Sequence, residues 1–600
     1  VQTCALPISQ QINMKKQLFN ALLCGLLTLP FMDVKADVVA EEQTTEGKDF
    51  WVTFLQADQG GADFSLDLAI SSRYHCNVTI SNPYTGYSET ITVQPNLTAN
   101  VNLDSSTNGA ETSAARSRQK NSNKVCYAFL SETVDTCALH ITSDSAISLF
   151  ASNYQYASFD ATNVLPTPSL QDEYIIQTYS PSDNDGDAKS QGSHFAIIAT
   201  EDNTIVDYCP TAMTERYNKV FDDANIGYVL DPADSALLNY KVGVDTLHTP
   251  VLMKGQVFYV WTGKGNSGIN ADFSGTYVKA RDGKEIAVFQ GCPHTNIPHK
   301  IKLRDHIFSQ AMPVHTWGNT FALTASNNRK RDIYRVLALN DGTTIYINGN
   351  LVHTFDFSID KKHYWEFELG VAYGSLAAPT AEGTSCFLTT SCPCAVHQFM
   401  VSQQYDGDSK NNGDPAMLWI NPIEQQINQI TFTTYDSKKG ETAHNVNIVT
   451  ANPEGVKLDD VDISSSFEQV NGSDGKYWFA RRSLGSATKS YTLRNDNGNF
   501  IAHVYGFTKN ESYAYSAGGY VKSLAQSIYI NGEEFSEDKE NKLCGIDTVH
   551  FACKPDFLPD SIVWHFGDGT PDIKLVQDTT TTVPHFYKNG GDYDATCTIY

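Results

Sequence analysis

Residues 276–291 read TYVKARDGKEIAVFQG, and residues 333–349 read IYRVLALNDGTTIYING. Each stretch places two runs of β-branched, aromatic and aliphatic residues on either side of a short segment that contains Asp-Gly. Asp-Gly adopts positive φ at low cost, so it favours a tight turn between paired strands. The two stretches therefore predict two β-hairpins, at 277–290 and 333–348, within a fold built from strands.

Both predicted hairpins recur along the chain in a fixed order, with a single aromatic or hydrophobic strand between them. The first type recurs at 137–153, 383–400 and 489–507, and the second at 66–81, 194–208 and 444–458. This internal repetition predicts four divergent copies of a unit of about seven strands. The predicted copies span residues 47–157, 172–293, 316–405 and 428–510.

Each copy is close to the size of a small β-sandwich domain. We therefore predict an all-β fold of tandem, immunoglobulin-like β-sandwich repeats. The same pattern also allows a propeller-like arrangement, in which the copies close into a ring.

Several separated motifs occur in the order expected for one known family. They are GKDFWVTFLQ at 47–56, DFSGTY at 272–277, PVHTWGNTFAL at 313–323, YRVLALNDGTTIYING at 334–349 and GDPAMLWINPIEQQINQITF at 413–432. Together they resemble the IgGFc-binding protein N-terminal domain family over residues 47–520. The resemblance implies a secreted or surface protein, in a family named after a mucus protein reported to bind antibody Fc. A shared fold does not transfer a ligand, so Fc binding is a hypothesis for this chain.

The N-terminal residues carry the features of export. Residues 1–13 match no structural pattern and resemble a translation artefact, which makes Met14 the expected start. Residues 14–36 match a secretory signal peptide, with two lysines, an apolar run and a small-residue cleavage site. Acylation of Cys24 is the weaker alternative. We predict that the mature chain is secreted or displayed at the cell surface of a bacterium.

The composition agrees with an exported protein of several domains. The chain has 600 residues, of which 41% are hydrophobic and 11% aromatic, enough to build several cores. Its formal charge of −25 opposes binding to nucleic acid or to anionic lipid. The apolar run at 18–31 is too short to span a membrane. We expect an extracellular protein or glycan as the partner, and anchoring through sequence beyond Tyr600.

Disulfide bonds are expected in an oxidising compartment. The chain has thirteen cysteines, and eleven remain after Cys4 and Cys24, which precede the predicted mature chain, are subtracted. The pairs favoured by their spacing are Cys126 with Cys137, Cys386 with Cys392 or Cys394, and two among Cys544, Cys553 and Cys597.

Two segments contain residue types that bind metal ions. The candidates are His294, His299 and His306, and the acidic run of Asp183, Asp185 and Asp187. Imidazoles bind zinc, and oxygen ligands at alternate positions are typical of calcium loops. The histidine spacing matches no ligand motif, however, and the acidic run lacks the glycine and the distal glutamate of a full calcium loop. We predict hydrogen-bonded or solvated side chains, with calcium as the weaker alternative and no other cofactor.

The last part of the chain differs from the repeats. Residues 562–569 read IVWHFGDG, and residues 585–587 read HFY. Over residues 525–600 the sequence resembles a PKD (polycystic kidney disease) domain, an immunoglobulin-like sandwich found in extracellular spacers. Strand alternation predicts that Trp564 and Phe566 point into its core, and that 567–569 forms a turn.

The sequence contains no catalytic motif in a matching structural context, so we expect no enzymatic activity. The first functional hypothesis is adhesin-like binding of an extracellular protein or glycoprotein, such as immunoglobulin or mucin, through loops of the repeats. The alternative is a structural surface spacer without a specific ligand. A secreted hydrolase is the least favoured hypothesis.

Overall fold

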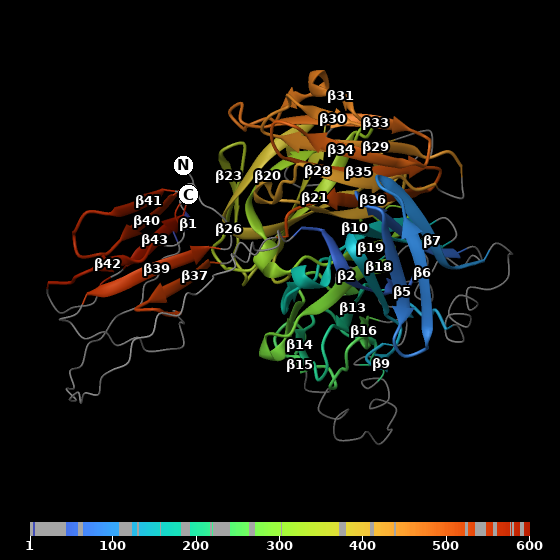
Figure 1. Cartoon of the computed structure of the whole chain (residues 1–600), viewed down its shortest axis with the longest axis horizontal. Coiled ribbons are helices and arrows are strands. Elements are labelled where there is room, and N and C mark those ends of the chain that lie inside the picture. Colours follow the sequence, from blue (N-terminus) through green and yellow to red (C-terminus); the bar gives the residue numbers. More distant parts are fainter. Residues whose placement is uncertain are drawn as a thin grey trace, which may run out of the picture. The chain divides into compact units, whose positions relative to one another are not determined.

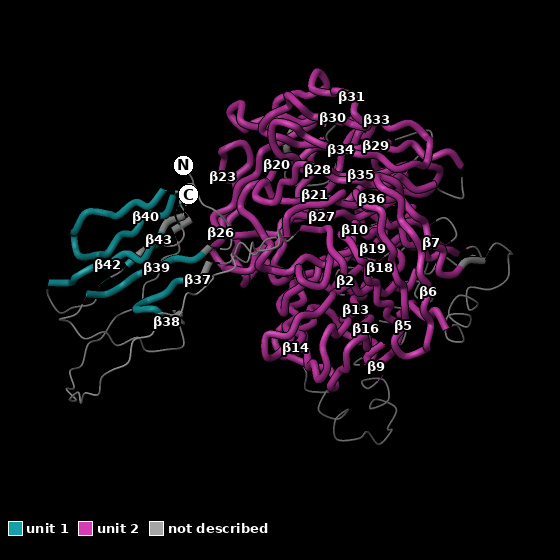
Figure 2. Tube along the Cα trace, in the orientation of Figure 1, with its two compact units in different colours: residues 1–42, 522–600 teal, residues 43–521 magenta. Residues whose placement is uncertain are grey.

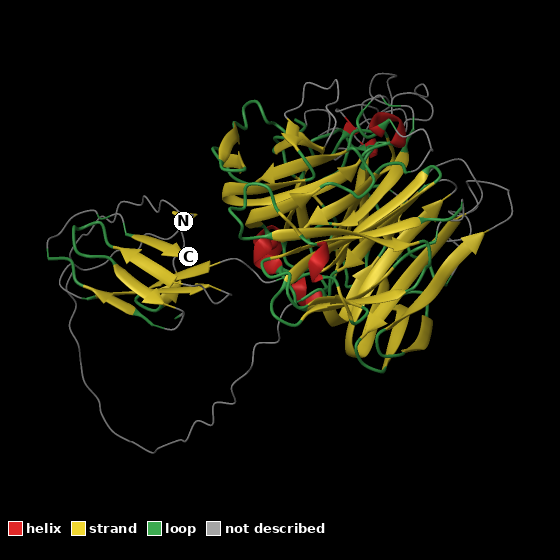
Figure 3. Cartoon of the chain, turned by 90° about the horizontal axis from the view of Figure 1, so that it is seen from above, coloured by secondary structure: helices red, strands yellow, loops and turns green. Residues whose placement is uncertain are grey.

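Strands form nearly all of the regular structure in the computed structural model (Figure 3). The structure describes residues 4–5, 44–57, 64–106, 123–128, 131–155, 158–181, 192–216, 219, 241–262, 271–299, 301, 303–370, 380–407, 413–436, 440–521, 526–534, 548–555, 561–576, 578, 581–588, 593 and 595–599. The predicted all-β fold is confirmed. The helical segments are short, as in α4 (Gln403–Asp406), and within the described ranges none is long and apolar enough to cross a membrane.

The chain divides into two units, one formed by residues 43–521 and one that joins residues 522–600 with 1–42 (Figure 2). The larger unit repeats one arrangement of seven to nine strands four times. In every repeat a four-stranded outer layer and an inner layer share one hydrophobic core, as in a β-sandwich.

The outer layers have the same strand order in all four repeats. In the first repeat the order is β2 (Glu46–Val52), β10 (Leu139–Gln155), β5 (Cys76–Asn82) and β6 (Tyr87–Val93). In the second it is β12 (Glu173–Ile175), β17 (Tyr277–Ala280), β14 (Val206–Cys209) and β15 (Leu247–His248). In the third it is β20 (Gly318–Thr324), β26 (Ser385–Met400), β22 (Thr344–Ile347) and β23 (Asn350–Thr354). In the fourth it is β28 (Gln429–Thr433), β34 (Ser490–Asn495), β30 (Val456–Leu458) and β31 (Val461–Asp462).

The first four strands of the inner layers also correspond in all four repeats, and the second, third and fourth repeats add a fifth strand at the edge. In the first repeat the order is β11 (Phe159–Val164), β10, β4 (Phe64–Ser72) and β7 (Leu97–Ser106). In the second it is β19 (Asp305–Gln310), β18 (Ile286–Thr295), β13 (His194–Ala199), β16 (Val257–Trp261) and β9 (Val134–Asp135). In the third it is β27 (Ala416–Ile420), β26, β21 (Arg331–Ala338), β24 (Tyr364–Gly370) and β25 (Thr380–Glu382). In the fourth it is β36 (Glu511–Gly518), β35 (Phe500–Thr508), β29 (Ala443–Thr450), β33 (Trp478–Gly485) and β32 (Glu468–Gln469).

One path of chain belongs to both layers of each repeat. In the first repeat this path is the continuous strand β10, whose residues 140–143 pair with β5 and whose residues 148–155 pair with β4. In the third repeat β26 has the same role. In the second and fourth repeats the path is divided into two strands, β17 with β18 and β34 with β35. This shared path holds the two layers of each sandwich in register.

Both types of predicted hairpin are wrong as strand pairings, because the two predicted strands do not pair with each other, and at 137–153 and 383–400 they belong to one continuous strand. Strands β17 and β18 lie in different sheets, and β21 and β22 pair with different halves of β26. At the first predicted turn, Asp282 has φ 60° and Gly283 has φ 66°. The Asp-Gly pair therefore does supply positive φ, but the turn carries the chain from one layer to the other. A corner between two sheets and a hairpin turn need the same turn residues, so composition alone did not separate them.

The last strand of each repeat lies at the centre of the larger unit. Strands β11, β19, β27 and β36 pack each against the next, and β36 packs against β11. Figure 1 labels two of them, β19 and β36, in the middle of the larger unit. The N-terminal segment closes the circle, since the Thr45 N–H donates to the Gly519 carbonyl at 2.9 Å and Thr44 bridges to Tyr520. The four repeats thus form a closed ring, the arrangement that the sequence had left as an alternative.

A short proline-led turn follows three of these central strands. Pro166, Pro313 and Pro422 precede the 3-10 turns η1 (Thr167–Ser169), η4 (Val314–Thr316) and η5 (Ile423–Gln425). Proline has no N–H to continue a ladder and fixes φ, so it ends the strand at a defined place. Each turn leads the chain from the ring centre into the outer layer of the next repeat.

The smaller unit is a separate two-sheet sandwich. One sheet has the order β38 (Glu533–Glu534), β37 (Gln526–Ile530), β39 (Val549–Pro555) and β42 (Val583–His585), and the other β1 (Cys4–Ala5), β43 (Thr596–Ile599), β40 (Ser561–His565) and β41 (Ile573–Val576). Trp564 and Phe566 are buried in its core, as predicted. Gly567 and Gly569 take positive φ in the bend that follows. Residues 4–5, which the sequence analysis excluded from the fold, pair with β43.

The structure joins no disulfide among the cysteines whose side chains it describes. A bond from Cys386 to Cys392 or Cys394 is excluded, because all three lie on the single strand β26. Six residues along a strand span about 20 Å, far beyond the reach of a disulfide. Cys126 and Cys137 both lie beside Thr53, whose hydroxyl contacts the backbone carbonyl oxygen of each. The two cysteines are therefore near each other, and a disulfide between them stays a prediction. Cys544 lies outside the described residues.

Candidate functional site on the ring axis

A single carboxylate, that of Asp160, joins the four central strands. Asp160 lies in β11 and is fully buried. Its Oδ1 accepts hydrogen bonds from the N–H groups of Ala161 at 2.9 Å and Ala514 at 3.3 Å. Its Oδ2 accepts from those of Phe308 at 3.1 Å and Met417 at 3.2 Å. One backbone donor from each repeat therefore converges on the same side chain.

The contacts of Asp160 favour its ionised form. Burial raises the pKa of this carboxyl well above its usual value, and the four N–H donors offset only part of that rise. A protonated carboxyl would direct its hydrogen at one of these donors, because both oxygens are already occupied as acceptors. Both oxygens of the Asp160 side chain are therefore engaged by the backbone of the four central strands.

A second set of polar side chains lies three residues before each donor. Ser158, Asp305, Asp414 and Glu511 precede Ala161, Phe308, Met417 and Ala514 by the same spacing, and all four are buried. Asp305 Oδ1 accepts from the N–H groups of Phe159 at 3.2 Å and His306 at 2.7 Å. The ring axis thus carries a buried acidic cluster, which we define as Asp305, Asp414 and Glu511.

The members of the acidic cluster repel one another. Burial and the nearby charge of Asp414 raise the pKa of Asp305 well above its usual value. Burial raises the pKa of Asp414 to about 8, Arg329 partly offsets this increase, and Glu511 adds to it. We infer that these two carboxyls are largely protonated when the ring is folded at neutral pH.

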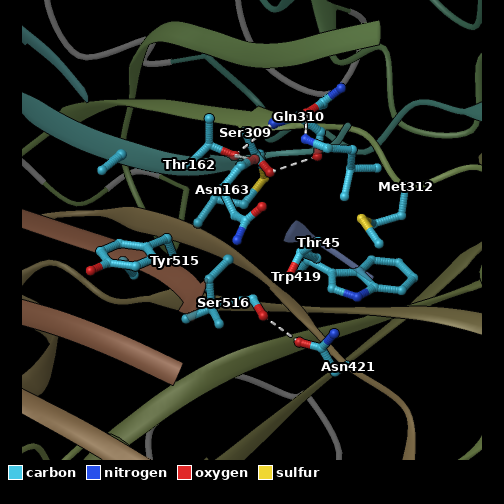
Figure 4. A pocket seen from close by; sticks show the side chains of 15 residues that line it. Thr45, Thr162, Asn163, Ser309, Gln310, Met312, Trp419, Asn421, Tyr515 and Ser516 are labelled. Atoms are coloured by element: carbon cyan, nitrogen blue, oxygen red, sulfur yellow. Dashed lines mark hydrogen bonds between the residues drawn. The ribbon is translucent and has the colours of Figure 1, made fainter. Parts of the chain in front are cut away.

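On the other side of Asp160, the ends of the same strands line a pocket of about 370 Å³, solvent at its mouth included (Figure 4). We call it the axial pocket. Its lining comes from all four repeats and contains no charged side chain. The lining residues are Thr45, Ala161, Thr162, Asn163, Leu165, Ser309, Gln310, Met312, Met417, Leu418, Trp419, Asn421, Ala514, Tyr515 and Ser516.

Several polar groups of the axial pocket are fixed by the protein. Thr162 Oγ1 accepts from the Gln310 N–H at 2.9 Å, and Gln310 Oε1 accepts from the Leu165 N–H at 2.7 Å. Ser516 donates to Asn421 Oδ1. These bonds orient the Gln310 amide so that its oxygen faces the backbone, which leaves its nitrogen to face elsewhere.

Comparison with known families gives a match over the larger unit. The family model described as IgGFc binding protein matches residues 160–506, which is more than half of the chain. The chain belongs to this family. The matched range begins at Asp160 itself, and in this IgGFc-binding family member it covers the second and third repeats and most of the fourth. The comparison with curated proteins gives no match.

Two of the predicted metal candidates of this family member lie in neighbouring strands of the second repeat. His294 and His306 lie in the neighbouring strands β18 and β19, and burial lowers the pKa of His306 to about 3. In the part of the chain that the structure describes, no three histidine, cysteine or acidic side chains are placed to hold a metal ion. Asp183, Asp185 and Asp187 lie outside the described residues.

Sequence reasoning missed the axial residues because it ended each copy one strand too early. The predicted copies stop at 157, 293, 405 and 510, and β11, β19, β27 and β36 follow these positions directly or after a short loop. Two signals mark these strands in the sequence. One is the proline-led turn after three of them, and the other is the polar residue three positions before each donor to Asp160.

Proposed function

We propose that this protein is an exported, surface-associated binding protein whose ligand is an extracellular protein or glycoprotein. The observation that carries this proposal is the family match over residues 160–506, because the description of that family names binding to the Fc part of IgG. Immunoglobulin is therefore the first ligand to test, and mucin-type glycoproteins are the second. The formal charge of −25 further supports a partner other than nucleic acid.

Exposed apolar side chains on the third repeat support contact with a protein surface. Strand β23 exposes Leu351 and Val352, and Ile359 in the following loop is 77% exposed. Large apolar side chains exposed on an edge strand and the loop after it are available for contact with a partner. We propose this outer edge of the ring, defined as Leu351, Val352 and Ile359, as part of the contact surface.

We infer that binding occurs without catalysis. Around the ring axis, the side chain of Asp160 is engaged with four backbone donors, which supports a structural role for it. The signal pattern at 14–36 supports export, and the resemblance of 525–600 to a PKD domain supports a spacer role for the smaller unit.

Capture of labelled ligands on the immobilised chain tests the proposal. Immunoglobulin G, its Fc and Fab fragments, and a mucin should be compared, with serum albumin as the control protein. We expect retention of Fc or mucin, and weaker retention by a Leu351→Ser, Ile359→Ser double variant of unchanged melting temperature. Retention of none of these ligands would instead support the structural-spacer hypothesis.

A further inference from the structure

We propose that Asn471 is a site of spontaneous deamidation, and that its conversion to an acid loosens the contact between the third and fourth repeats. We call this contact the joint and define it by Asn348, Ser385 and Phe387 of the third repeat and the turn at 470–473 of the fourth. The inference goes beyond the proposed function and does not depend on the identity of the ligand. It is carried by an Asn-Gly pair that the fold requires at the joint and by the hydrogen bonds of the asparagine.

A tight turn between β32 and β33 brings the fourth repeat onto the third. Its Ser473 N–H donates to the Val470 carbonyl at 3.2 Å. The two central positions of the turn are held by Asn471 and Gly472. Gly472 has φ 77°, and a Cβ added to it would lie 2.6 Å from the Cα of Asn348. Only glycine therefore fits after this asparagine.

The required glycine leaves the asparagine side chain open to attack by the backbone. Gly472 has no Cβ to shield its nitrogen, and both Asn471 and Gly472 are exposed to water. Among the described residues, no backbone carbonyl accepts a hydrogen bond from the Gly472 N–H. This nitrogen is thus available, once it loses its proton, to react with Cγ of the preceding side chain.

The reaction needs water and no other reagent. The Gly472 nitrogen forms a bond to Asn471 Cγ while the bond from Cγ to Nδ2 breaks. The proton of the Gly472 amide leaves with the Nδ2 group as ammonia, and a cyclic imide remains. Water then adds to one of the two imide carbonyl carbons and opens the ring, which gives aspartate or isoaspartate at position 471.

The Asn471 side chain holds the joint as a hydrogen-bond donor. Its Nδ2 donates to the Ser385 carbonyl at 3.1 Å, and its backbone N–H donates to Ser385 Oγ at 3.1 Å. Ser385 is buried at the start of β26 in the third repeat. A carboxylate has no hydrogen to donate. Deamidation therefore replaces the Nδ2 bond by a contact between two acceptor oxygens, which repel each other.

The other asparagine of the joint tolerates the same change better. Asn348 also precedes a glycine, but its Oδ1 accepts from the Phe387 N–H at 2.9 Å. A carboxylate oxygen can accept in the same way. Asn497 precedes Gly498 and is exposed in a turn within the fourth repeat. Of these three asparagines, Asn471 is thus the one whose amide hydrogens join two repeats.

Peptide mapping by mass spectrometry on the full chain tests the reaction. We expect a peptide with aspartate or isoaspartate at position 471 to accumulate, faster at pH 8 than at pH 6.5, because the attacking nitrogen must lose a proton. Asn471→Gln is the control and should stay unmodified there, since the longer side chain would have to close a larger and slower-forming ring. A native chain that keeps the amide at 471 while Asn497 is converted would overturn the proposal.

Hydrogen exchange tests the effect on the joint. Asn471→Asp should increase the exchange rate of the Phe387 N–H about tenfold, the effect of one lost hydrogen bond. Asn497→Asp adds the same charge within the fourth repeat and is the matched control, so it should leave this rate unchanged. The same Phe387 rate in both variants would show that deamidation leaves the joint closed, and would overturn the proposed loosening.

Discussion

Asp160 links four segments that are separated by more than 350 positions in the sequence, from Ala161 to Ala514. Four backbone donors on one carboxylate satisfy groups that would otherwise be buried without partners. The residue is thus a structural centre, around which the acidic cluster and the axial pocket are arranged on opposite sides.

Replacement of Asp160 by asparagine should destabilise the ring. The asparagine amide nitrogen would face two N–H donors, so those donors would lose their acceptor inside the protein. We expect a loss of at least about 3 kcal/mol in the free energy of unfolding, measured by urea titration. The exposed Asp474→Asn is the control and should change stability by less than about 0.5 kcal/mol. Equal stability of the two variants would contradict the central role of Asp160.

The acidic cluster predicts a fall in stability as the pH rises from about 4 towards 8. The folded-state pKa of Asp414 is about 8, far above the value of about 4 in an unfolded chain, so folding holds a proton that the unfolded chain releases. The stabilisation is complete below the unfolded value and is lost as the pH rises towards 8. Between pH 6.5 and 8 we expect the titration of Asp414 to lower the free energy of unfolding by up to about 1.4 kcal/mol per pH unit.

Urea titrations at pH 6.5 and pH 8 check this dependence. Asp414→Asn should make the dependence less steep, because the amide does not titrate, and Asp305 should account for the slope that remains. Below pH 6.5 a second dependence of opposite sign is expected from buried histidines. Burial lowers the pKa values of His306, His397 and His503 to about 3, so their contribution is lost as the pH falls. An Asp414→Asn variant that keeps the native slope above pH 6.5 would contradict the assignment.

At the scale of elements, burial patterns distinguish the two layers more clearly than turn residues do. The inner strands β13, β18 and β21 are buried at every position, whereas the outer strands β14, β22 and β34 alternate. An inner strand is covered on one face by its own sandwich and on the other by the ring. Within a predicted hairpin, one strand is therefore a continuous apolar run and the other alternates apolar with polar residues. This change in pattern was the sequence signal that the chain crosses from the inner to the outer layer.

The smaller unit predicts one inter-sheet disulfide. Cys553 on β39 and Cys597 on β43 come from opposite sheets, and the proximity of Cys553 together with burial raises the pKa of Cys597. In an oxidising compartment we expect them to bond, which would stabilise this unit by about 4 kcal/mol for a loop of this length. Peptide mapping without reductant should detect the linked pair. Recovery of both as free thiols from protein exported to such a compartment would refute the pairing.

At the scale of the whole molecule, the closed ring predicts cooperative unfolding of the larger unit. In a linear array each repeat contacts only its neighbours and can open alone. Here the first repeat packs on the fourth, and Asp160 bonds to all four. We expect calorimetry to show one transition for residues 43–521 and a separate one for the smaller unit.

A core substitution tests this coupling. Ile448→Ala in β29 of the fourth repeat removes fully buried methyl groups and should cost about 3 kcal/mol. Hydrogen exchange should then accelerate in β13 and β18 of the second repeat as well. An effect confined to the fourth repeat would show that the repeats unfold independently, as a linear array does.

The sequence by itself determined the all-β class, the four-fold repetition, the family resemblance and the inward side chains of the last sandwich. These features depend on local periodicity and on motifs read along one segment of chain. Only the tertiary structure decided which strands pair, that the ring closes, and that Asp160, Gln310 and Trp419 lie around one axis. The physical reason is that these contacts join residues of different repeats, and the free energy that selects them comes from burying four strands against each other.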